Sequence, residues 1–360
     1  MKTVFVIIML HVFFLPTVLC GQSTDAELAM KKAKGAVTLM DAGRYEESIK
    51  LLRESQTLDP SRFMYSYEIA LAYVYQDQYK AAIKELKKTL QYEDINSQVY
   101  QLMGNAYSMN GQKDAAIEYY QKGLEQFPNS GNLYLEIGNV YSQREKYNDA
   151  ISSYENGIKV DPTYTSNYYQ LSKLFLRSSN KVPGLIYGEI FMNLERTTER
   201  TREMSKIIYT AYDEAIYIKE DSADIDFCQI IIMATPESME EGEVNLPYCA
   251  YYAKHYLFAT ALHKQFDLAA LSSMRELFIN AYMDTDGEKY PVILFDYHQR
   301  MIDAEVFEAY NYYLFQMAEP AAFDGWLDSH QGDYDKFVSW YTDPKNILEV
   351  NRDNVYLRYN

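Results

Sequence analysis

The sequence repeats itself every 34 residues over its first half. Gly104 and Gly138 lie 34 residues apart, and so do Tyr107 and Tyr141. Further pairs with the same offset are Ala116 and Ala150, Tyr120 and Tyr154, Gly123 and Gly157, and Pro128 and Pro162. A fixed period of about 20–50 residues is the signature of a repeat array. This half of the chain is therefore expected to form a solenoid, in which each repeat contacts mainly its neighbours.

Each copy reads as two amphipathic helices, because its apolar residues recur at spacings of three and four. A small residue in the first helix lets the two helices approach closely, and an aromatic residue one turn later fills the remaining space. The small positions are Ala36, Ala70, Gly104, Gly138 and Ser172, and the aromatic positions are Tyr73, Tyr107, Tyr141 and Phe175. Stacked pairs bury the apolar face that one pair leaves open, which predicts an all-α superhelix with a concave surface.

This pattern resembles the tetratricopeptide repeat (TPR) family. The family has a small residue at position 8 of a 34-residue unit, an aromatic at 11, alanine at 20, an aromatic at 24, a small residue at 27 and proline at 32. The resemblance covers Ala29 to Tyr164 as four repeats, and a fifth begins near Thr165 and loses the pattern at Pro183 and Gly184. We expect a TPR array over residues 25–196 and an irregular all-helical C-terminal domain over residues 197–360.

Residues 1–20 have the features of a secretory signal peptide. Lys2 precedes an apolar run from Val4 to Leu15 that is too short to span a bilayer comfortably. We expect cleavage after Cys20 or Gly21, and we expect the mature protein to be soluble in the periplasm or cell envelope. The alternative is a lipoprotein signal with Cys20 as the lipidated residue, and Leu19 argues against it, because Gly, Ala or Ser normally stands there.

The second half continues the helical spacing without the 34-residue period. The spacing predicts helices over residues 198–219, 249–263, 267–283 and 299–317, with short helices around Trp326 and 337–340. Residues 227–233 fit either a strand or a buried helix, and the helical surroundings favour the helix. Residues 298–312 look similar to a C-terminal region of secreted bacterial TPR proteins, a likeness that implies architecture and an envelope setting but no activity.

Two cysteines remain after the predicted signal peptide, Cys228 and Cys249. In an oxidising compartment an even number permits one disulfide, and two buried free thiols are the alternative.

Composition and motifs give little support to catalysis, cofactor binding or metal binding. The 51 Asp and Glu against 34 Lys and Arg disfavour nucleic acids and anionic membranes as main partners. The aromatic columns of the repeats absorb many of the 36 tyrosines, so no cofactor is needed to explain them. No two of the later histidines have the four-residue spacing of a metal site on a helix. Motifs for nucleophilic catalysis, phosphate binding and dinucleotide binding are missing. We expect no cofactor, no metal and no enzymatic activity.

The resemblance also implies a set of ligand-binding residues. In the family, five positions of each first helix face the concave groove. On this chain they give a groove of Tyr67, Leu71, Tyr75, Gln101, Asn105, Asn132, Asn139, Tyr169, Lys173 and Arg177. It would run from apolar and aromatic, through amide-rich, to basic. In the alternative, some of these side chains contact the fifth repeat or the second half instead. The basic pair with which some family members clamp a peptide's terminal carboxylate is replaced by Ser166 and Gln170.

These features favour a non-catalytic, exported adaptor that binds a protein or an extended peptide in its groove. Two alternatives stay open, an enzyme with its site in the C-terminal domain and an envelope-assembly lipoprotein anchored at Cys20.

Overall fold

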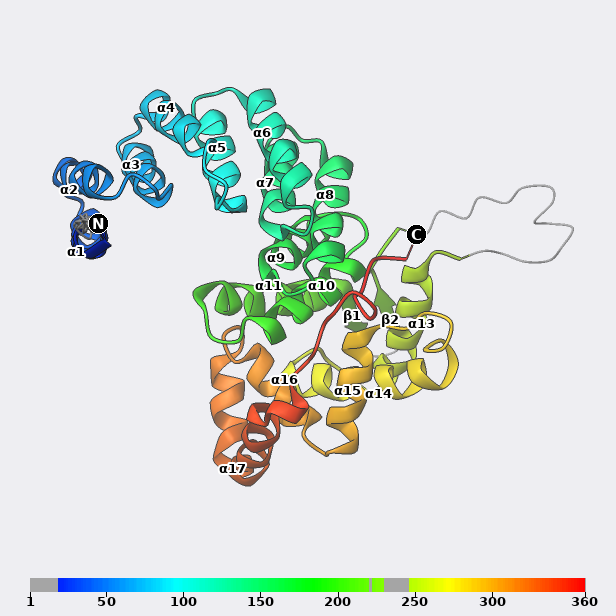
Figure 1. Ribbon diagram of the computed structural model, residues 1–360. Coiled ribbons are helices and arrows are strands. Elements are labelled where there is room, and N and C mark those ends of the chain that lie inside the picture. Colours follow the sequence, from blue (N-terminus) through cyan, green and yellow to red (C-terminus); the bar gives the residue numbers. More distant parts are fainter. Residues whose placement is uncertain (1–18, 220–221, 230–245, 360) are drawn as a thin grey trace, which may run out of the picture. The chain divides into compact units, whose positions relative to one another are not determined.

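The computed structural model describes residues 19–219, 222–229 and 246–359 (Figure 1). The chain divides into two compact units, Met1–Tyr119 and Tyr120–Asn360, and each is described by itself. The expected signal peptide lies outside the described residues, apart from its last two positions at the start of the first helix. Within the described ranges, no helix combines the length and apolarity needed to cross a membrane.

Unit 1 is a run of antiparallel helix pairs. Gly43 and Asp77 have φ of 73° and 58° and turn the chain between the two helices of a pair, a conformation that costs glycine nothing. Two small apolar clusters hold the unit together, one around Ala36 and Leu52 and one around Ala70 and Leu86. The helices are α1 (Leu19–Asp41), α2 (Tyr45–Leu58), α3 (Met64–Tyr75), α4 (Tyr79–Thr89) and α5 (Ser97–Met109); α6 (Lys113–Gln126) ends beyond the boundary.

Unit 2 begins with two further pairs, α7 (Gly131–Gln143) with α8 (Tyr147–Val160), and α9 (Thr165–Leu176) with α10 (Val182–Leu194). The sequence pattern is lost at Pro183 and Gly184, but the helix pair continues through them. Pro183 occupies the first turn of α10, where its missing N–H has no partner to lose. Ser172 Oγ donates to Gly184 O at 2.8 Å, and a Cβ on Gly184 would lie 2.8 Å from Leu176 N. The fifth pair is therefore complete and closely packed.

The 34-residue phase continues into the next helix, α11 (Glu199–Ala215). Its first residue lies 34 positions after Thr165, the first residue of α9. The predicted helix over 198–219 is too long at its C-terminal end. Residues Ile216–Lys219 form β1, which pairs antiparallel with β2 (Ser222–Ile225), since alternating isoleucine and tyrosine favour a strand.

The remaining helices of unit 2 are α13 (Tyr248–Thr260), α14 (Leu268–Thr285), α15 (Ile293–Asp303), α16 (Phe307–Phe315) and α17 (Pro320–Thr342), followed by the 3-10 turn η1 (Pro344–Asn346). The single helix predicted over 299–317 is wrong, because Glu305 adopts a φ of 53° and separates α15 from α16. The two short helices predicted around Trp326 and 337–340 are the two helical segments of α17, which meet at a kink at His330.

Cys228 and Cys249 form a disulfide with Cα atoms 6.2 Å apart. Cys228 also forms a β-bridge with Asn180, and Lys181 N donates to Phe227 O at 2.8 Å. The predicted buried helix is therefore wrong over residues 227–229, and the rest of it lies outside the described residues.

One continuous apolar core runs through unit 2, from Leu135 on α7 to Tyr356 near the end of the chain. Residues 347–359, here called the strap, cross back over the array in extended form (Figure 1). Arg352 donates to Val160 O on α8 at 2.6 Å, and Arg358 pairs with Glu155 at 3.2 Å. The strap therefore joins the last helices of the array to the C-terminal helices.

Candidate functional site

The predicted groove residues of unit 1 lie on α3 and α5. Tyr67 and Leu71 are half-buried and pack against the cluster around Ala70. Tyr75 is 56% exposed and stacks on Tyr45 with ring centroids 5.8 Å apart. Gln101 and Asn105 are half-buried on α5, and each already interacts within the protein. Only Tyr75 of these five therefore offers a largely open surface.

The predicted amides of unit 2, Asn132 and Asn139, lie half-buried on α7. Asn139 Oδ1 accepts from Tyr154 Oη at 2.9 Å, and its Nδ2 donates to Glu136 Oε2 at 3.1 Å. Asn132 also interacts within the protein. The hydrogen bond to Tyr154 joins α7 to α8, so Asn139 stabilises its own repeat.

The predicted basic end of the groove is shared between α9 and α11. Tyr169 Oη donates to Glu203 Oε2 at 2.5 Å, and Lys173 Nζ lies 3.0 Å from Glu203 Oε1. These two hydrogen bonds, from Tyr169 and then Lys173, lower the pKa of the Glu203 carboxyl. Glu203 therefore offsets the charge of Lys173, and Tyr169 is itself buried.

A hollow of about 290 Å³ lies between α9 and α11. Leu176, Ile207 and Ala211 form its apolar floor. Arg177 and Lys206 stand at its edge, both exposed, and neither forms a hydrogen bond or an ion pair with any residue that the structure describes. We call this feature the α9–α11 hollow. Its chemistry suits an apolar side chain beside an acidic one.

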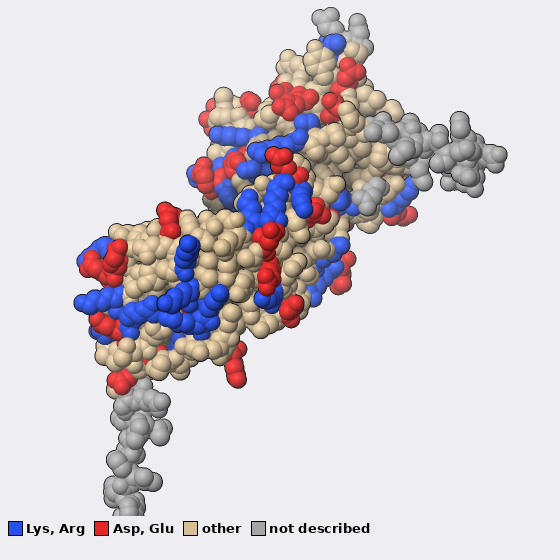
Figure 2. Space-filling model, turned by 90° about the horizontal axis from the view of Figure 1, so that it is seen from above, with Lys and Arg blue, Asp and Glu red and all other residues tan. Residues whose placement is uncertain are grey.

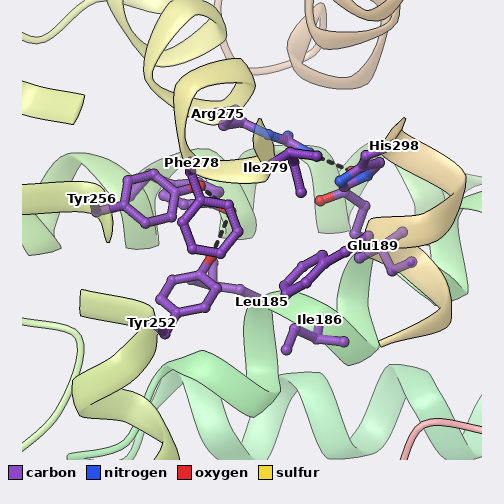
Figure 3. A pocket seen from close by; sticks show the side chains of 12 residues that line it. Leu185, Ile186, Glu189, Tyr252, Tyr256, Arg275, Phe278, Ile279 and His298 are labelled. Atoms are coloured by element: carbon purple, nitrogen blue, oxygen red, sulfur yellow. Dashed lines mark hydrogen bonds and ion pairs between the residues drawn. The ribbon is translucent and has the colours of Figure 1, made fainter. Parts of the chain in front are cut away.

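A second cluster of polar groups lies in the centre of unit 2 (Figure 3). Glu189 on α10 accepts three hydrogen bonds at one oxygen, Oε1: from Arg275 Nη2 at 2.5 Å, from His298 Nε2 at 2.7 Å and from Tyr310 Oη at 2.8 Å. Each of the three partners comes from a different helix, α14, α15 or α16. The cluster therefore joins four helices of the core at one carboxylate.

Charges in this cluster are set by burial and by pairing. Burial alone would raise the pKa of Glu189, but Arg275 and His298 hold it at about 2. Burial lowers the pKa of His298, which leaves the imidazole neutral and donating from Nε2. Glu189, Arg275 and His298 are each 2% exposed. The cluster presents no reactive group to solvent, so its geometry supports packing and not substrate chemistry. Among the described residues, no group of three His, Cys, Asp or Glu is placed to hold a metal ion.

Comparison with known proteins assigns the repeats. Two family models described as tetratricopeptide repeat match residues 97–130 and 131–164, in the phase that the sequence and the helix pairs share. Residues 97–164 of this chain are tetratricopeptide repeats. No curated protein matches it significantly in sequence.

Several solved structures are similar to this chain over about half of its length. MamA from Desulfovibrio magneticus RS-1 is 17% identical, with a TM-score of 0.38 over 48% of this chain and 98% of that one. PilF from Pseudomonas aeruginosa is 16% identical, with a TM-score of 0.43 over 52% and 84%. YrrB, a TPR protein described as having an unusual peptide-binding site, is 17% identical, with a TM-score of 0.35 over 51% and 95%.

The TPR pattern identified Lys173 and Arg177 on α9 but missed the residues of α11 that face them. Ser166 and Arg200 lie 34 residues apart, and Arg200 Nη1 donates to Ser166 Oγ at 3.0 Å. Tyr169 and Glu203 have the same offset. Continuing the count one repeat further would have found Arg200, Glu203 and Ile207, but not Lys206, which lies 34 residues after the small residue Ser172.

Proposed function

We propose that this TPR protein is an exported scaffold that binds an extended segment of a partner protein along its concave faces. Tetratricopeptide repeats form helical scaffolds for protein interaction, and this chain contains such repeats. The proposed segment places an apolar residue in the α9–α11 hollow and an acidic residue next to it. The observation that carries the proposal is the pair of exposed cations, Arg177 and Lys206, above an apolar floor, neither with an ion-pair partner among the described residues. Glu214 also lines the hollow, and Arg177 helps to lower the pKa of Glu203, so the positive charge is only partly offset.

The energetics favour moderate affinity. An apolar side chain gains about 25 cal/mol for each Å² that it removes from water in the hollow. Exposed ion pairs with Arg177 and Lys206 add roughly 0–1 kcal/mol each and weaken with salt. We therefore expect the apolar residue to supply most of the affinity and the acidic residue to fix the register of the segment.

Two features support export. Residues 1–20 have the pattern of a signal peptide, and a disulfide such as Cys228–Cys249 persists mainly in oxidising compartments. Amino-terminal sequencing of the exported protein tests this part, with Gly21 or Gln22 expected as the first residue. A lipid-modified Cys20 would favour the lipoprotein alternative.

The binding site is tested by charge reversal. The mature protein captures its partner from the native cell envelope, and the captured protein is then titrated against Arg177→Glu combined with Lys206→Glu. We expect at least a tenfold loss of affinity, equal to about 1.4 kcal/mol. The matched control, Lys146→Glu with Lys264→Glu, changes two exposed lysines outside the hollow and is expected to bind normally. Equal binding by the two double variants would reject the α9–α11 hollow as the site.

A further inference from the structure

A second cavity of unit 2 lies between the α10–α11 turn, α16 and α17. Its volume is about 210 Å³, and it shares no lining residue with the α9–α11 hollow. Arg196, Thr197 and Arg202 supply polar groups from the turn and from α11, and Met192, Leu314 and Met317 supply apolar surface. We call it the α16 cleft.

Arg196 is held in place without any carboxylate partner. Its Nη1 donates to Tyr341 O at 2.7 Å and its Nε to Asn193 O at 3.2 Å, while the guanidinium lies 3.8 Å above the Tyr341 ring. The remaining nitrogen, Nη2, is buried and finds no acceptor among the described residues. A guanidinium stays charged under all ordinary conditions, and a buried charged donor without an acceptor is costly. Arg196 is therefore a pre-oriented cation with one donor group left over.

A second cation stands at the rim of the same cleft. Arg202 pairs only with Glu199, at 3.2 Å, and the two side chains are 60% and 85% exposed. An ion pair so exposed to water contributes little and is easily exchanged for another. The hydroxyl of Thr197 is exposed beside it. An incoming anion would therefore meet two arginines of the cleft lining, Arg196 fixed by its contacts with Tyr341 and Asn193, and Arg202 exposed.

The opposite wall limits what kind of anion fits. Met192 is buried, Leu314 is 2% exposed and Met317 is 37% exposed, so this side offers carbon and sulfur surface and no charge. Methionine side chains adapt to irregular apolar ligands. A cavity of about 210 Å³ whose lining includes two arginines and these apolar side chains suits a carboxylate on a short apolar group.

We propose that the α16 cleft binds a carboxylate that carries a short branched or linear apolar tail. The charges of the Arg196 and Arg202 side chains that line the cleft hold the carboxylate, and the tail packs on Met192, Leu314 and Met317. Such a ligand is either a free small organic acid or the C-terminal residue of a peptide. The site goes beyond the proposed scaffold function, because it lies outside the concave positions of the repeats.

The recognition of charge is tested by calorimetric titration of the full mature chain with N-acetyl-L-leucine and with its uncharged analogue, N-acetyl-L-leucinamide. We expect saturable binding of the acid and at least tenfold weaker binding of the amide. Isovalerate and an acetylated tetrapeptide ending in leucine separate the two sources, since the tighter of the two identifies a free acid or a peptide end. The proposal would be overturned if none of the acids bound saturably at concentrations up to roughly 10 mM. A Kd above that concentration would mean that the cleft has no useful affinity. Equal binding of acid and amide would do so as well.

The location is tested by substitutions that leave the contacts of Arg196 with Tyr341 and Asn193 in place. Thr197→Glu puts a carboxylate beside Arg196 and is expected to abolish binding of N-acetyl-L-leucine. Thr197→Gln, its uncharged match, is expected to weaken binding far less than Thr197→Glu does. Arg202→Gln is expected to weaken binding at least threefold. If Thr197→Glu and Thr197→Gln bind equally, the acid occupies another site and the proposal fails.

Discussion

Unit 1 and unit 2 are built from the same kind of helix pair but are held together differently. Unit 1 has separate small clusters between adjacent helices, whereas unit 2 has one core that runs from Leu135 to Tyr356. Stability in unit 1 should therefore approximate a sum over neighbouring interfaces. Stability in unit 2 depends on contacts between residues that are far apart in the sequence.

The two units also differ in charge. Residues 25–119 contain 12 Lys and Arg against 14 Asp and Glu, and residues 120–360 contain 21 against 37. Part of unit 1 is locally basic, because α4 presents four exposed lysines, and Lys and Arg side chains gather at the left of the face in Figure 2. Long-range repulsion of acidic partners therefore comes mainly from unit 2. Arg177 and Lys206 of the α9–α11 hollow attract an acidic residue only at short range, because salt screens their charges.

Loss of the Glu189 carboxylate should give the largest difference in stability effect between the two units. Glu189→Ala leaves the buried Arg275 without its ion pair, 2.5 Å in length, and is expected to cost about 3–5 kcal/mol of unit 2 stability. Urea unfolding, followed by hydrogen exchange and mass spectrometry, measures the unfolding free energy of each unit separately. The control, Glu85→Ala in unit 1, frees Arg53 and Lys88, whose side chains are 38% and 46% exposed. Because these cations return to water, its cost is expected to be only about 1–2 kcal/mol, and equal costs would contradict the comparison.

The disulfide gives the next largest effect. Replacing both Cys228 and Cys249 by serine removes a cross-link over 21 positions and is expected to lower unit 2 stability by roughly 3 kcal/mol. Faster hydrogen exchange should appear in α13 and around residues 226–229. Unit 1 should exchange at its normal rate, and a slowing or quickening there would show that the two units are coupled.

Close packing inside the repeats gives an intermediate effect. A Cβ at Gly138 would lie 2.3 Å from Tyr154 Cε1, so Gly138→Ala is expected to destabilise by about 1–3 kcal/mol. Gly325 lies in the helix α17, where a Cβ would meet no neighbouring atom within 4 Å, and Gly325→Ala is expected to stabilise by roughly 0.5–1 kcal/mol. Thermal unfolding of both variants measures the difference. A neutral Gly138→Ala would mean that the Tyr154 ring has room to move.

The smallest effect is a decrease in stability with falling pH, confined to unit 2. Burial lowers the pKa of His298 and of His255 in the folded state, so the unfolded chain binds protons first as the pH falls below about 6.5. Unfolding free energy of unit 2 should therefore decrease from pH 7 toward pH 5.5. Residues 19–119 contain no histidine, so unit 1 should show no such decrease; burial raises the pKa of its Glu68, which acts in the opposite direction. His298→Gln should flatten part of the slope; an unchanged slope would assign it to His255 or to the carboxylates.

Below this range a second loss is expected. The folded-state pKa of Glu189 is about 2, so its ion pair contributes fully above the ordinary range of a glutamate and is lost as the pH falls from about 4.5 toward 2.

The sequence predicts the repeated part of the fold well because each pair repeats a local pattern. The small residues Gly104, Gly138 and Ser172 predict that the two helices of a repeat approach closely. This prediction needs no knowledge of contacts with distant parts of the sequence. The sequence did not show that the fifth helix pair continues through Pro183 and Gly184, because these residues end helices in most contexts. In this protein they begin α10 and let it approach Leu176.

The buried cluster could not be predicted, because Glu189 and Arg275 are 86 positions apart and no local pattern pairs them. A signal was nevertheless present in the sequence of α10, VPGLIYGEIFMNL, where Glu189 is the one charged residue. A lone acid in an apolar helix requires a buried cation, although its spacing does not say which. In the candidate groove, the family positions gave Arg177 correctly as an exposed cation but gave Asn139 a ligand-binding role, while its amide contacts Tyr154 and Glu136.

The strap has a consequence for the order in which the protein is made. Val160 and Glu155 on α8 receive their partners from Arg352 and Arg358, which the ribosome adds almost two hundred residues later. The pairs of unit 1 can form as they emerge, since their contacts lie within a few dozen residues. Unit 2 has to wait until nearly all of its chain has been synthesised and, if exported, translocated. Newly made molecules should therefore pass through a stage with folded early repeats and with α8 lacking its contacts to the strap. A chaperone that meets the chain at this stage would find Tyr187 on α10 without the Tyr356 ring that packs against it in the finished fold.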